Sequence, residues 1–284
     1  SFKFLIEHNP YVDKLHLLED KLGDTIQQLK KENFDYIIDL HNSLRSTILK
    51  FRLQVKSSTY KKERIKKILA LKFRVNLINP DHLVDRYLKT VEFLGVKNDF
   101  LPIDYYLPKN TPSLEEIHPK INKNSYVAFV IGATHFTKRL PNYKVVEICK
   151  GLNLPIVLLG GKDVVANAIE IENCLPNSII NLVGVVSLND SVTIVKNAAS
   201  VIGFDTGLTH IAEAFNKKLV TIWGSTVPEL LGVQPYLVEK HYEAGVALSC
   251  RPCSKFGLAK CPKGHFKCMN EINEQSITQF IMNG

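Results

Sequence analysis

The sequence lacks the features that mark membrane-spanning proteins and proteins stabilised by disulfide bonds. No apolar run approaches the roughly 18 residues that a bilayer span requires, and the N-terminus shows no basic-then-apolar export pattern. Six cysteines in a chain of 284 residues do not make a disulfide framework. We therefore expect a protein that works in a reducing cytoplasm.

Acidic residues are in the minority. The chain has 36 Lys and Arg against 28 Asp and Glu, a formal charge of +8. This balance favours anionic partners, which could be nucleic acid, phosphorylated metabolites or an acidic membrane surface. The remaining composition, 45% hydrophobic and 23% charged, excludes disordered and fibrous classes. At roughly 150 residues per domain, the length predicts two domains or one large one.

The second half of the chain alternates between two patterns. Runs that are apolar on both faces, typical of buried parallel strands, occupy residues 126–130, 155–159, 178–182, 201–204 and 219–223. Apolar spacings of three and four predict helices over residues 142–152, 164–174, 189–198 and 208–215, with a capping box at Ser187 and Asp190. The alternation predicts an α/β fold with a doubly wound parallel sheet, whose ligands bind at the carboxyl ends of the strands.

The first hundred residues predict a smaller α/β domain. The expected strands are residues 15–18, 34–40 and 74–78, and the expected helices are residues 25–32 and 82–94, the latter capped by Asp81. A polar, proline-rich segment at 108–124 is typical of a linker. We therefore expect an N-terminal domain at 1–115, a larger domain at 116–268 and a C-terminal helix within 269–284.

Three of the predicted strands end in loops that suit a bound diphosphate. The first loop carries Gly132, the hydroxyls of Thr134 and Thr137, and the cations Lys138 and Arg139 just before a helix, where free N–H groups attract anions. The second is a Gly-Gly-Lys-Asp turn ending at Asp163, and carboxylates at such places bind ribose hydroxyls in dinucleotide folds. A simple turn is the alternative for each loop.

The third loop is the most specific, because a buried strand runs directly into Asp205-Thr206-Gly207 and a helix follows at once. Phosphate oxygens fit such a helix start. Asp205 needs a partner such as Lys138 or a sugar hydroxyl, since an unpaired buried carboxylate is costly. His210, on the first helical turn, could donate to a phosphate or cap the helix.

These segments resemble the lipopolysaccharide heptosyltransferases, glycosyltransferase family 9. The matching stretches, in order, are GATHFTKRLP, LLGGKD, NLVGVVSL, VIGFDTGLTHIAEAF and VTIWGSTVP, together with FDYIIDLHNSLRST in the first half. The resemblance implies a GT-B architecture with two Rossmann-like domains, a nucleotide-sugar donor on the C-terminal one and a lipid A-core acceptor on the N-terminal one. It further implies inversion at the anomeric centre, with no divalent metal and no cofactor.

The resemblance also implies roles for individual residues. By position, Lys138 neutralises the leaving diphosphate and Thr134 contacts the phosphates, while Asp163 contacts the adenosine ribose and Val186 the adenine. Lys138 and Asp205 are the residues implied to be catalytic. The residues implied to surround the phosphates and the heptose are Asp205, Thr206, Gly207 and His210.

The sequence departs from the family at its start. Family members begin with a strand and a glycine-rich loop whose Asp takes the proton of the acceptor hydroxyl, whereas this sequence starts after that point. We therefore expect it to lack the first βαβ portion and the general base, which leaves the N-terminal domain incomplete. Asp24 follows a glycine but precedes the FDYIIDL strand, which argues against it. Asp39 and His41 are the alternatives.

Two further segments could bind a partner. Residues 45–74 hold eleven Lys or Arg and one acid, Glu63, interleaved with apolar residues. That pattern suits an anionic membrane surface or a phosphorylated lipid, or is merely a solvated face; the aromatics do not form a stacking platform for nucleic acid. Four cysteines near the C-terminus could hold zinc, although packed reduced thiols are the simpler interpretation: Cys250, Cys253, Cys261 and Cys268.

The resulting hypothesis is a heptosyltransferase that uses ADP-heptose and acts on the lipopolysaccharide inner core at the inner face of the inner membrane. A GT-B transferase that uses another nucleotide-sugar is one alternative. A non-catalytic nucleotide-sugar-binding protein and an anion-binding adaptor that works through the basic segment are the others.

Overall fold

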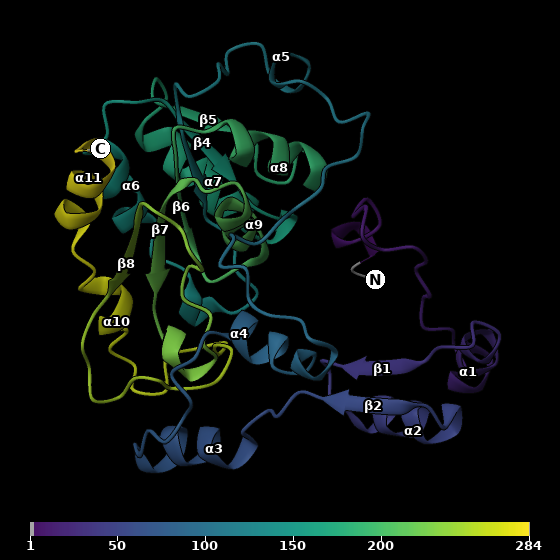
Figure 1. Ribbon diagram of the computed structural model, residues 1–284. Helices are drawn as coiled ribbons and strands as arrows, with labels where there is room; N and C mark the ends of the chain where they lie inside the picture. The colour runs from purple at the N-terminus through teal and green to yellow at the C-terminus, as the bar shows by residue number, and fades with distance from the viewer. Residues whose placement is uncertain (1–2, 284) are drawn as a thin grey trace. The chain divides into compact units, whose positions relative to one another are not determined.

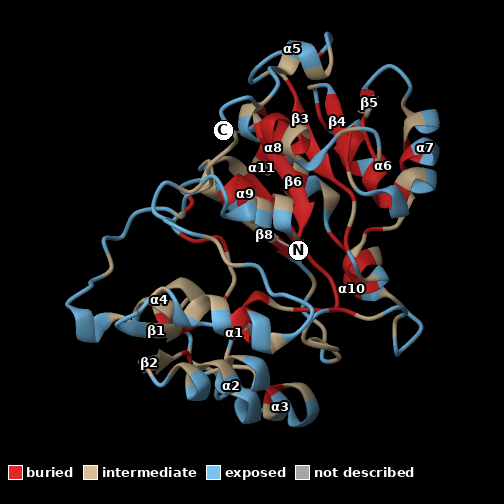
Figure 2. Cartoon of the chain, turned by 90° about the vertical axis from the view of Figure 1, so that its right-hand side faces the viewer, coloured by how far each residue is buried: buried red, intermediate tan, exposed pale blue. Residues whose placement is uncertain are grey.

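The computed structural model describes residues 3–283, and the chain divides into two compact units, one up to Leu101 and one from Pro102 onward. The sequence placed this boundary at 115–116. Within the described residues, no helix is both long and apolar enough to cross a bilayer. Buried residues concentrate in the sheet of the second unit and in the helices that cover it, whereas the first unit is mostly half-buried or exposed (Figure 2).

The first unit holds two parallel strands that pair residue for residue from Tyr36–Lys56 to Asp39–Thr59. A helix connects them, as a parallel pair requires. The elements of this unit are α1 (Leu22–Lys30), β1 (Tyr36–Asp39), α2 (Leu44–Leu53), β2 (Lys56–Thr59), α3 (Arg64–Phe73) and α4 (Leu83–Leu88).

Several sequence-based expectations for this unit are wrong. Residues 15–18 form no strand, and Leu17 and Leu18 stay exposed instead of packing. Residues 74–78 form none either, because Arg74 ends α3 in the left-handed conformation (φ 58°) and the residues that follow join no strand. The expected helix at 82–94 breaks after α4, and His82, not Asp81, caps it. β2 was missed because its sequence, KSST, has no apolar pattern.

The second unit is built on a six-stranded, fully parallel sheet in the order β5-β4-β3-β6-β7-β8 (Figure 1). Its strands are β3 (Val127–Val130), β4 (Ile156–Leu159), β5 (Ile179–Asn181), β6 (Ser200–Phe204), β7 (Lys218–Trp223) and β8 (His241–Gly245). Its helices are α5 (Leu114–Ile117), α6 (Asn142–Lys150), α7 (Val165–Cys174), α8 (Leu188–Asn197), α9 (Gly207–Ala214), α10 (Lys267–Asn270) and α11 (Glu274–Met282). This confirms the predicted doubly wound α/β sheet and adds one strand, β8.

Both faces of this sheet are covered, because successive side chains of each strand point to opposite sides. Val127 and Phe129 of β3 join the core beneath α6, α7 and α11, whereas Ala128 and Val130 join the core beneath α8 and α9. α8 begins with the predicted capping box, in which the Ser187 hydroxyl accepts from the Asp190 N–H and the Asp190 carboxylate accepts from the Ser187 N–H. The rigid sheet fixes where its carboxyl-end loops lie.

Candidate functional site

The candidate site lies at the carboxyl ends of β3 and β6. These two strands are neighbours in the sheet although β4 and β5 lie between them along the chain, because the strand order reverses between β3 and β6. At such a reversal the connecting loops diverge and leave a crevice, which is where ligands of open α/β sheets bind. The loop after β3 carries Lys138, and the loop after β6 carries Asp205.

A cavity of about 620 Å³ opens at this crevice. It is lined by thirteen residues, and five of them are residues that the sequence assigned to a donor: Thr134, Asp163, Val186, Thr206 and Gly207. Three further glycines line it, and one of them brings two loops together, since a side-chain carbon at Gly132 would lie 3.4 Å from the Cα of Gly160. The cavity therefore unites segments from four βα connections.

Lys138 and Asp205 form a buried ion pair beside this cavity. The Lys138 ammonium donates to Asp205 Oδ2 at 2.6 Å and also to the Asp205 main-chain oxygen. The two side chains are only 11% and 12% exposed. The partner predicted for Asp205 is thus present, and the pair joins the two loops across the strand reversal. Two of the three Lys138 N–H donors are engaged, which leaves one for a ligand.

His210 extends this pair into a chain of four charged groups. Its Nε2 lies 3.1 Å from Asp205 Oδ1, and its Nδ1 lies 2.7 Å from Glu213 Oε1. Burial works against the cation, but the hydrogen bonds to Asp205 and Glu213 outweigh it and raise the pKa of His210 to about 9. Burial likewise opposes ionisation of Asp205, but bonds from His210 and Lys138 hold its pKa below the ordinary value. The arrangement favours an ionised Asp205 between two cations.

Glu213 is a residue that the sequence analysis missed. It lies on α9, three positions after His210, and its side chain is 4% exposed. The signal that could have found it is this spacing, because residues three apart on a helix are neighbours. A buried carboxylate needs a partner, and His210 is the nearest cationic group on the same face.

The start of α9 faces the cavity with its first N–H groups. Thr206 precedes the helix in extended conformation, and its hydroxyl makes no capping bond to the helix. Instead it lies 3.3 Å from the Thr209 hydroxyl, which donates to the Phe204 carbonyl oxygen at 2.6 Å. The first N–H groups of a helix have no intrahelical acceptor, and Gly207 and Leu208 both line the cavity. They can therefore serve anionic oxygens.

Two loop residues have different roles from those expected. Thr137 was grouped with the hydroxyls that face a phosphate, but it is 1% exposed and bonds to Ser225 Oγ at 2.7 Å. The loop after β7 therefore holds the Lys138 turn in place from behind. Arg139 pairs with the Asp163 carboxylate, and its Nε donates to the Ala133 carbonyl oxygen at 2.6 Å. Its charge thus fixes the two loop ends that flank the cavity.

The candidates for a general base in the first unit lie in unfavourable settings. Asp24 is exposed in the first turn of α1, before β1. Asp39, at the end of β1, pairs with the Lys50 ammonium at 2.8 Å and accepts from the Asn42 N–H at 2.7 Å. Although burial opposes the effect, these contacts lower the pKa of Asp39 to about 2, which makes it a weak base at neutral pH. His41 donates its backbone N–H to the same carboxylate at 3.0 Å.

The cysteine-rich segment contains free thiols. Cys250 Sγ lies 3.9 Å from His265 Nε2, and Cys268 is buried, which raises its pKa to about 11. Across residues 3–283, no group of three or more His, Cys, Asp or Glu side chains is arranged to hold a metal ion. The arrangement therefore gives no support to the zinc alternative at Cys250, Cys253, Cys261 and Cys268.

Sequence comparison relates this chain to a known protein family. A family model described as glycosyltransferase family 9 (heptosyltransferase) matches residues 23–260. Lipooligosaccharide heptosyltransferase 2 of Haemophilus influenzae is 28% identical over 217 residues, which span 70% of this chain and 63% of that protein. Lipopolysaccharide heptosyltransferase 1 of Campylobacter coli is 24% identical over 310 residues, 99% of this chain and 86% of that protein. The chain thus matches less than two thirds of the first relative's length.

Solved structures share the fold. The Escherichia coli ADP-heptose lipopolysaccharide heptosyltransferase II superposes with a TM-score of 0.71 at 18% identity, over 98% of this chain and 84% of that one. A family 9 glycosyl transferase from Veillonella parvula superposes with a TM-score of 0.75 at 17% identity, over 99% of this chain and 86% of that one. At these identities the likeness concerns the architecture, which agrees with the GT-B expectation.

Proposed function

Because the chain belongs to glycosyltransferase family 9, we propose that it is a glycosyltransferase that moves heptose from ADP-heptose to the inner core of lipopolysaccharide. The observation that carries the proposal is the Lys138–Asp205 ion pair beside a 620 Å³ cavity at the strand reversal. Five residues expected to bind the donor line that cavity. The names of the relatives, which are heptosyltransferases, agree with this choice of sugar.

In the proposed reaction, the acceptor hydroxyl attacks the anomeric carbon of the donor. A new carbon–oxygen bond forms, the bond to the diphosphate breaks, and ADP leaves with the bonding electrons. The free N–H of Lys138 and the N–H groups at the start of α9 would meet the charge that develops on the diphosphate, with His210⁺ adding positive charge nearby. Donors fixed before the reaction stabilise such charge without having to reorganise. The base that takes the acceptor's proton is assigned to no residue of this chain.

Nucleotide preference tests this proposal. Asp163 and Val186 both line the cavity, where they are proposed to meet the ribose and the adenine. We expect calorimetry to show ADP binding several-fold more tightly than UDP, because both nucleotides share the ribose that meets Asp163 and the larger adenine buries more apolar surface against Val186. Asp163→Asn should weaken ADP binding, whereas Glu170→Asn, on the exposed face of α7, should not. Tighter binding of UDP would favour the transferase that uses another nucleotide-sugar.

Release of ADP separates the catalytic proposal from a binding protein. We expect the protein, when it is incubated with ADP-heptose and isolated lipopolysaccharide core, to release one ADP for each donor molecule consumed. ADP binding without any acceptor-dependent release would favour the non-catalytic alternative instead.

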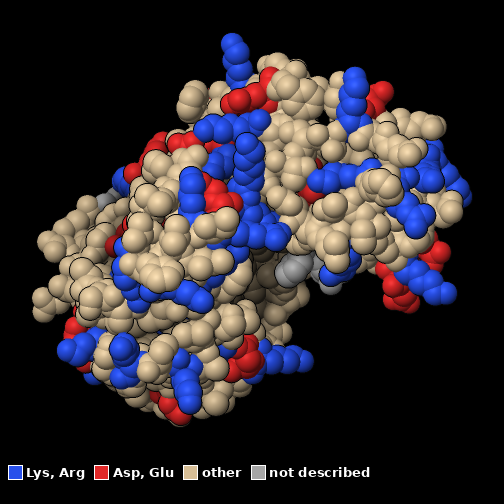
Figure 3. All heavy atoms as spheres, turned by 90° about the horizontal axis from the view of Figure 1, so that it is seen from below, with Lys and Arg blue, Asp and Glu red and all other residues tan. Residues whose placement is uncertain are grey.

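We further propose that the protein works peripherally at the cytoplasmic face of an anionic membrane, which would present a lipid A-core acceptor. α3 supports this, because its apolar side chains Ile65 and Phe73 are 75% and 66% exposed, whereas its Lys67 side chain is buried. On α2, Phe51 is 77% exposed. Figure 3, which shows the molecule from below, has Lys and Arg side chains spread over the surface in view. Apolar side chains among cations suit a lipid surface.

Vesicle binding tests the membrane proposal. Burying one such side chain in lipid contributes about 1.5–3 kcal/mol, so Phe51→Ser and Ile65→Ser should each weaken sedimentation with anionic vesicles about tenfold or more. Phe256→Ser, which removes a 56% exposed aromatic from the second unit, is the matched control and should bind normally. Equal binding by all three variants would contradict this surface.

A further inference from the structure

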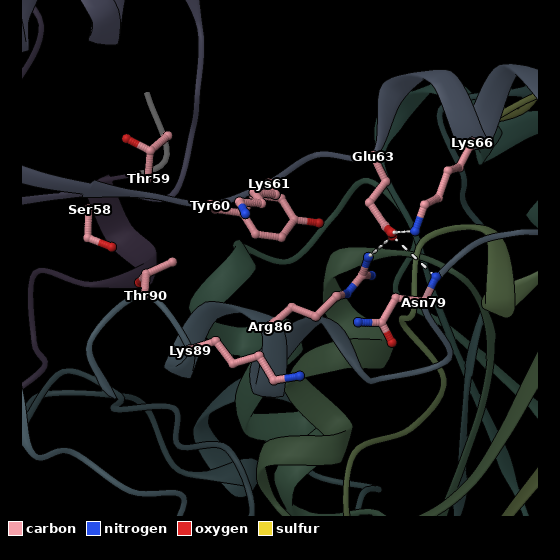
Figure 4. A pocket seen from close by; sticks show the side chains of 10 residues that line it. All are labelled: Ser58, Thr59, Tyr60, Lys61, Glu63, Lys66, Asn79, Arg86, Lys89 and Thr90. Carbon is pink, nitrogen blue, oxygen red and sulfur yellow. Dashed lines mark hydrogen bonds and ion pairs between the residues drawn. The ribbon is translucent and has the colours of Figure 1, made fainter. Parts of the chain in front are cut away.

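The first unit contains a cavity that the proposed function does not use. It measures about 590 Å³ and lies between the end of β2, the start of α3 and α4 (Figure 4). Its lining residues are Ser58, Thr59, Tyr60, Lys61, Glu63, Lys66, Asn79, Arg86, Lys89 and Thr90. A volume of this size falls in the range of small-molecule sites.

Positive charge dominates the lining. Glu63 is its one carboxylate, and it accepts from Lys66 at 2.6 Å and from Arg86 at 3.2 Å. Figure 4 shows these side chains and the Asn79 backbone converging on the Glu63 carboxylate. Lys89 pairs with Asp81, which lies outside the lining. Four cations therefore face two carboxylates, and the net positive charge of two matches the two negative charges of a phosphate monoester dianion.

The Tyr60 hydroxyl and the Lys61 ammonium, both in the lining, have no partner among residues 3–283. The Tyr60 hydroxyl is buried without a hydrogen-bond partner there, in a side chain that is only 5% exposed. In Figure 4 it points toward the ion-paired side chains. Lys61 is exposed and forms no ion pair within that described range. A buried hydroxyl without a hydrogen bond is costly, and an anionic oxygen bound in the cavity would accept from it and remove that cost.

We propose that this cavity binds a phosphate monoester on a saccharide-sized molecule. Lys61 and Tyr60 supply the donors that the phosphate oxygens need, and Glu63 holds Lys66 and Arg86 in position around them. The phosphate can belong to a soluble sugar phosphate or to a lipid. The proposal does not rest on the proposed transferase activity, because the cavity lies wholly in the first unit and the donor cavity lies in the second.

Titration calorimetry of the full chain with glucose 6-phosphate at low salt tests the proposal, with glucose as the uncharged control. We expect binding of the phosphate ester only. Tyr60→Phe and Lys61→Gln should each weaken it about tenfold, since each removes a hydrogen bond to a charged group. Neither substitution leaves a buried group unpaired, so both variants should fold. The matched controls are Tyr87→Phe, on the ring packed against Tyr60, and Lys62→Gln, outside the lining.

The outcome also depends on which unit holds the phosphate. If Lys138→Met abolishes glucose 6-phosphate binding while Tyr60→Phe and Lys61→Gln keep it, the phosphate occupies the second unit and the proposal fails. Absence of any binding overturns it equally. Titration with monomeric dihexanoyl phosphatidic acid identifies the source of the phosphate. If this lipid binds more tightly than glucose 6-phosphate and Lys61→Gln weakens its binding, the ligand is a lipid phosphate. If it binds more weakly, the ligand is a soluble phosphate ester. Normal ADP binding alongside failure here would leave the proposed transferase intact.

Discussion

Replacing Lys138 by methionine is expected to weaken ADP binding by about 10- to 100-fold, the range for a hydrogen bond to a charged group in a low-dielectric site. The Lys138 side chain is 11% exposed, and its ammonium binds Asp205, two residues before the start of α9, where the diphosphate is proposed to bind. Where transfer can be measured, turnover should fall further, by about 10²–10³, because negative charge on the leaving diphosphate grows in the transition state. Calorimetry and ADP release measure the two effects.

This substitution also leaves the Asp205 carboxylate without one of its two cations, so its effect on stability must be separated from its effect on binding. Removing one partner of a buried ion pair costs about 3–5 kcal/mol. Lys138→Met combined with Asp205→Asn removes both charges, and we expect the double variant to regain much of the melting temperature while ADP binding stays weak. Lys150→Met, at the exposed end of α6, should change neither. ADP binding restored in the double variant would mean that Lys138 acts on the fold alone.

The fold of the second unit could be predicted because its strands are buried on both faces. Runs such as 155–159 and 201–204 are apolar throughout, and only a sheet covered by helices on both sides requires this. β8 was missed for the opposite reason: its sequence, HYEAG, is mostly polar and lies at the sheet edge. In the first unit the two strands are short and half-exposed, so periodicity carries little information there.

The candidate site could be predicted as far as its strand-end loops. Parallel strands bring those loops to one edge, so Thr134, Thr206 and Gly207 were expected together before any distance was known. Direction of the side chains could not be predicted: Thr137 turns inward to Ser225, and Arg139 turns to Asp163. Such choices depend on which hydroxyl or carboxylate happens to lie within reach in three dimensions.

Glu213→Gln is expected to make ADP binding sensitive to pH between 7 and 9. In the native chain the pKa of His210 is raised to about 9, above its ordinary value of 6.5, because bonds to Asp205 and Glu213 outweigh burial. The positive charge beside the diphosphate, and the stability that it contributes, are therefore complete below pH 6.5 and lost as pH rises through 9. Glutamine keeps an oxygen that accepts from His210 Nδ1 but removes the negative charge. The pH at which His210 loses its proton should therefore fall by about one unit.

A purely structural role for Glu213 predicts a different result, and NMR titration of the imidazole distinguishes the two. His210→Gln identifies the resonance among the nine histidines. If Glu213 keeps His210 protonated, the Glu213→Gln variant should show a lowered His210 pKa, and ADP affinity at pH 9 should fall several-fold while affinity at pH 6 stays native. A uniform loss of affinity at both pH values, with an unchanged titration, would show that Glu213 only packs against α9. Because the His210 side chain is 36% exposed, solvent screening limits the accompanying change in stability, and the binding profile is the more sensitive measurement.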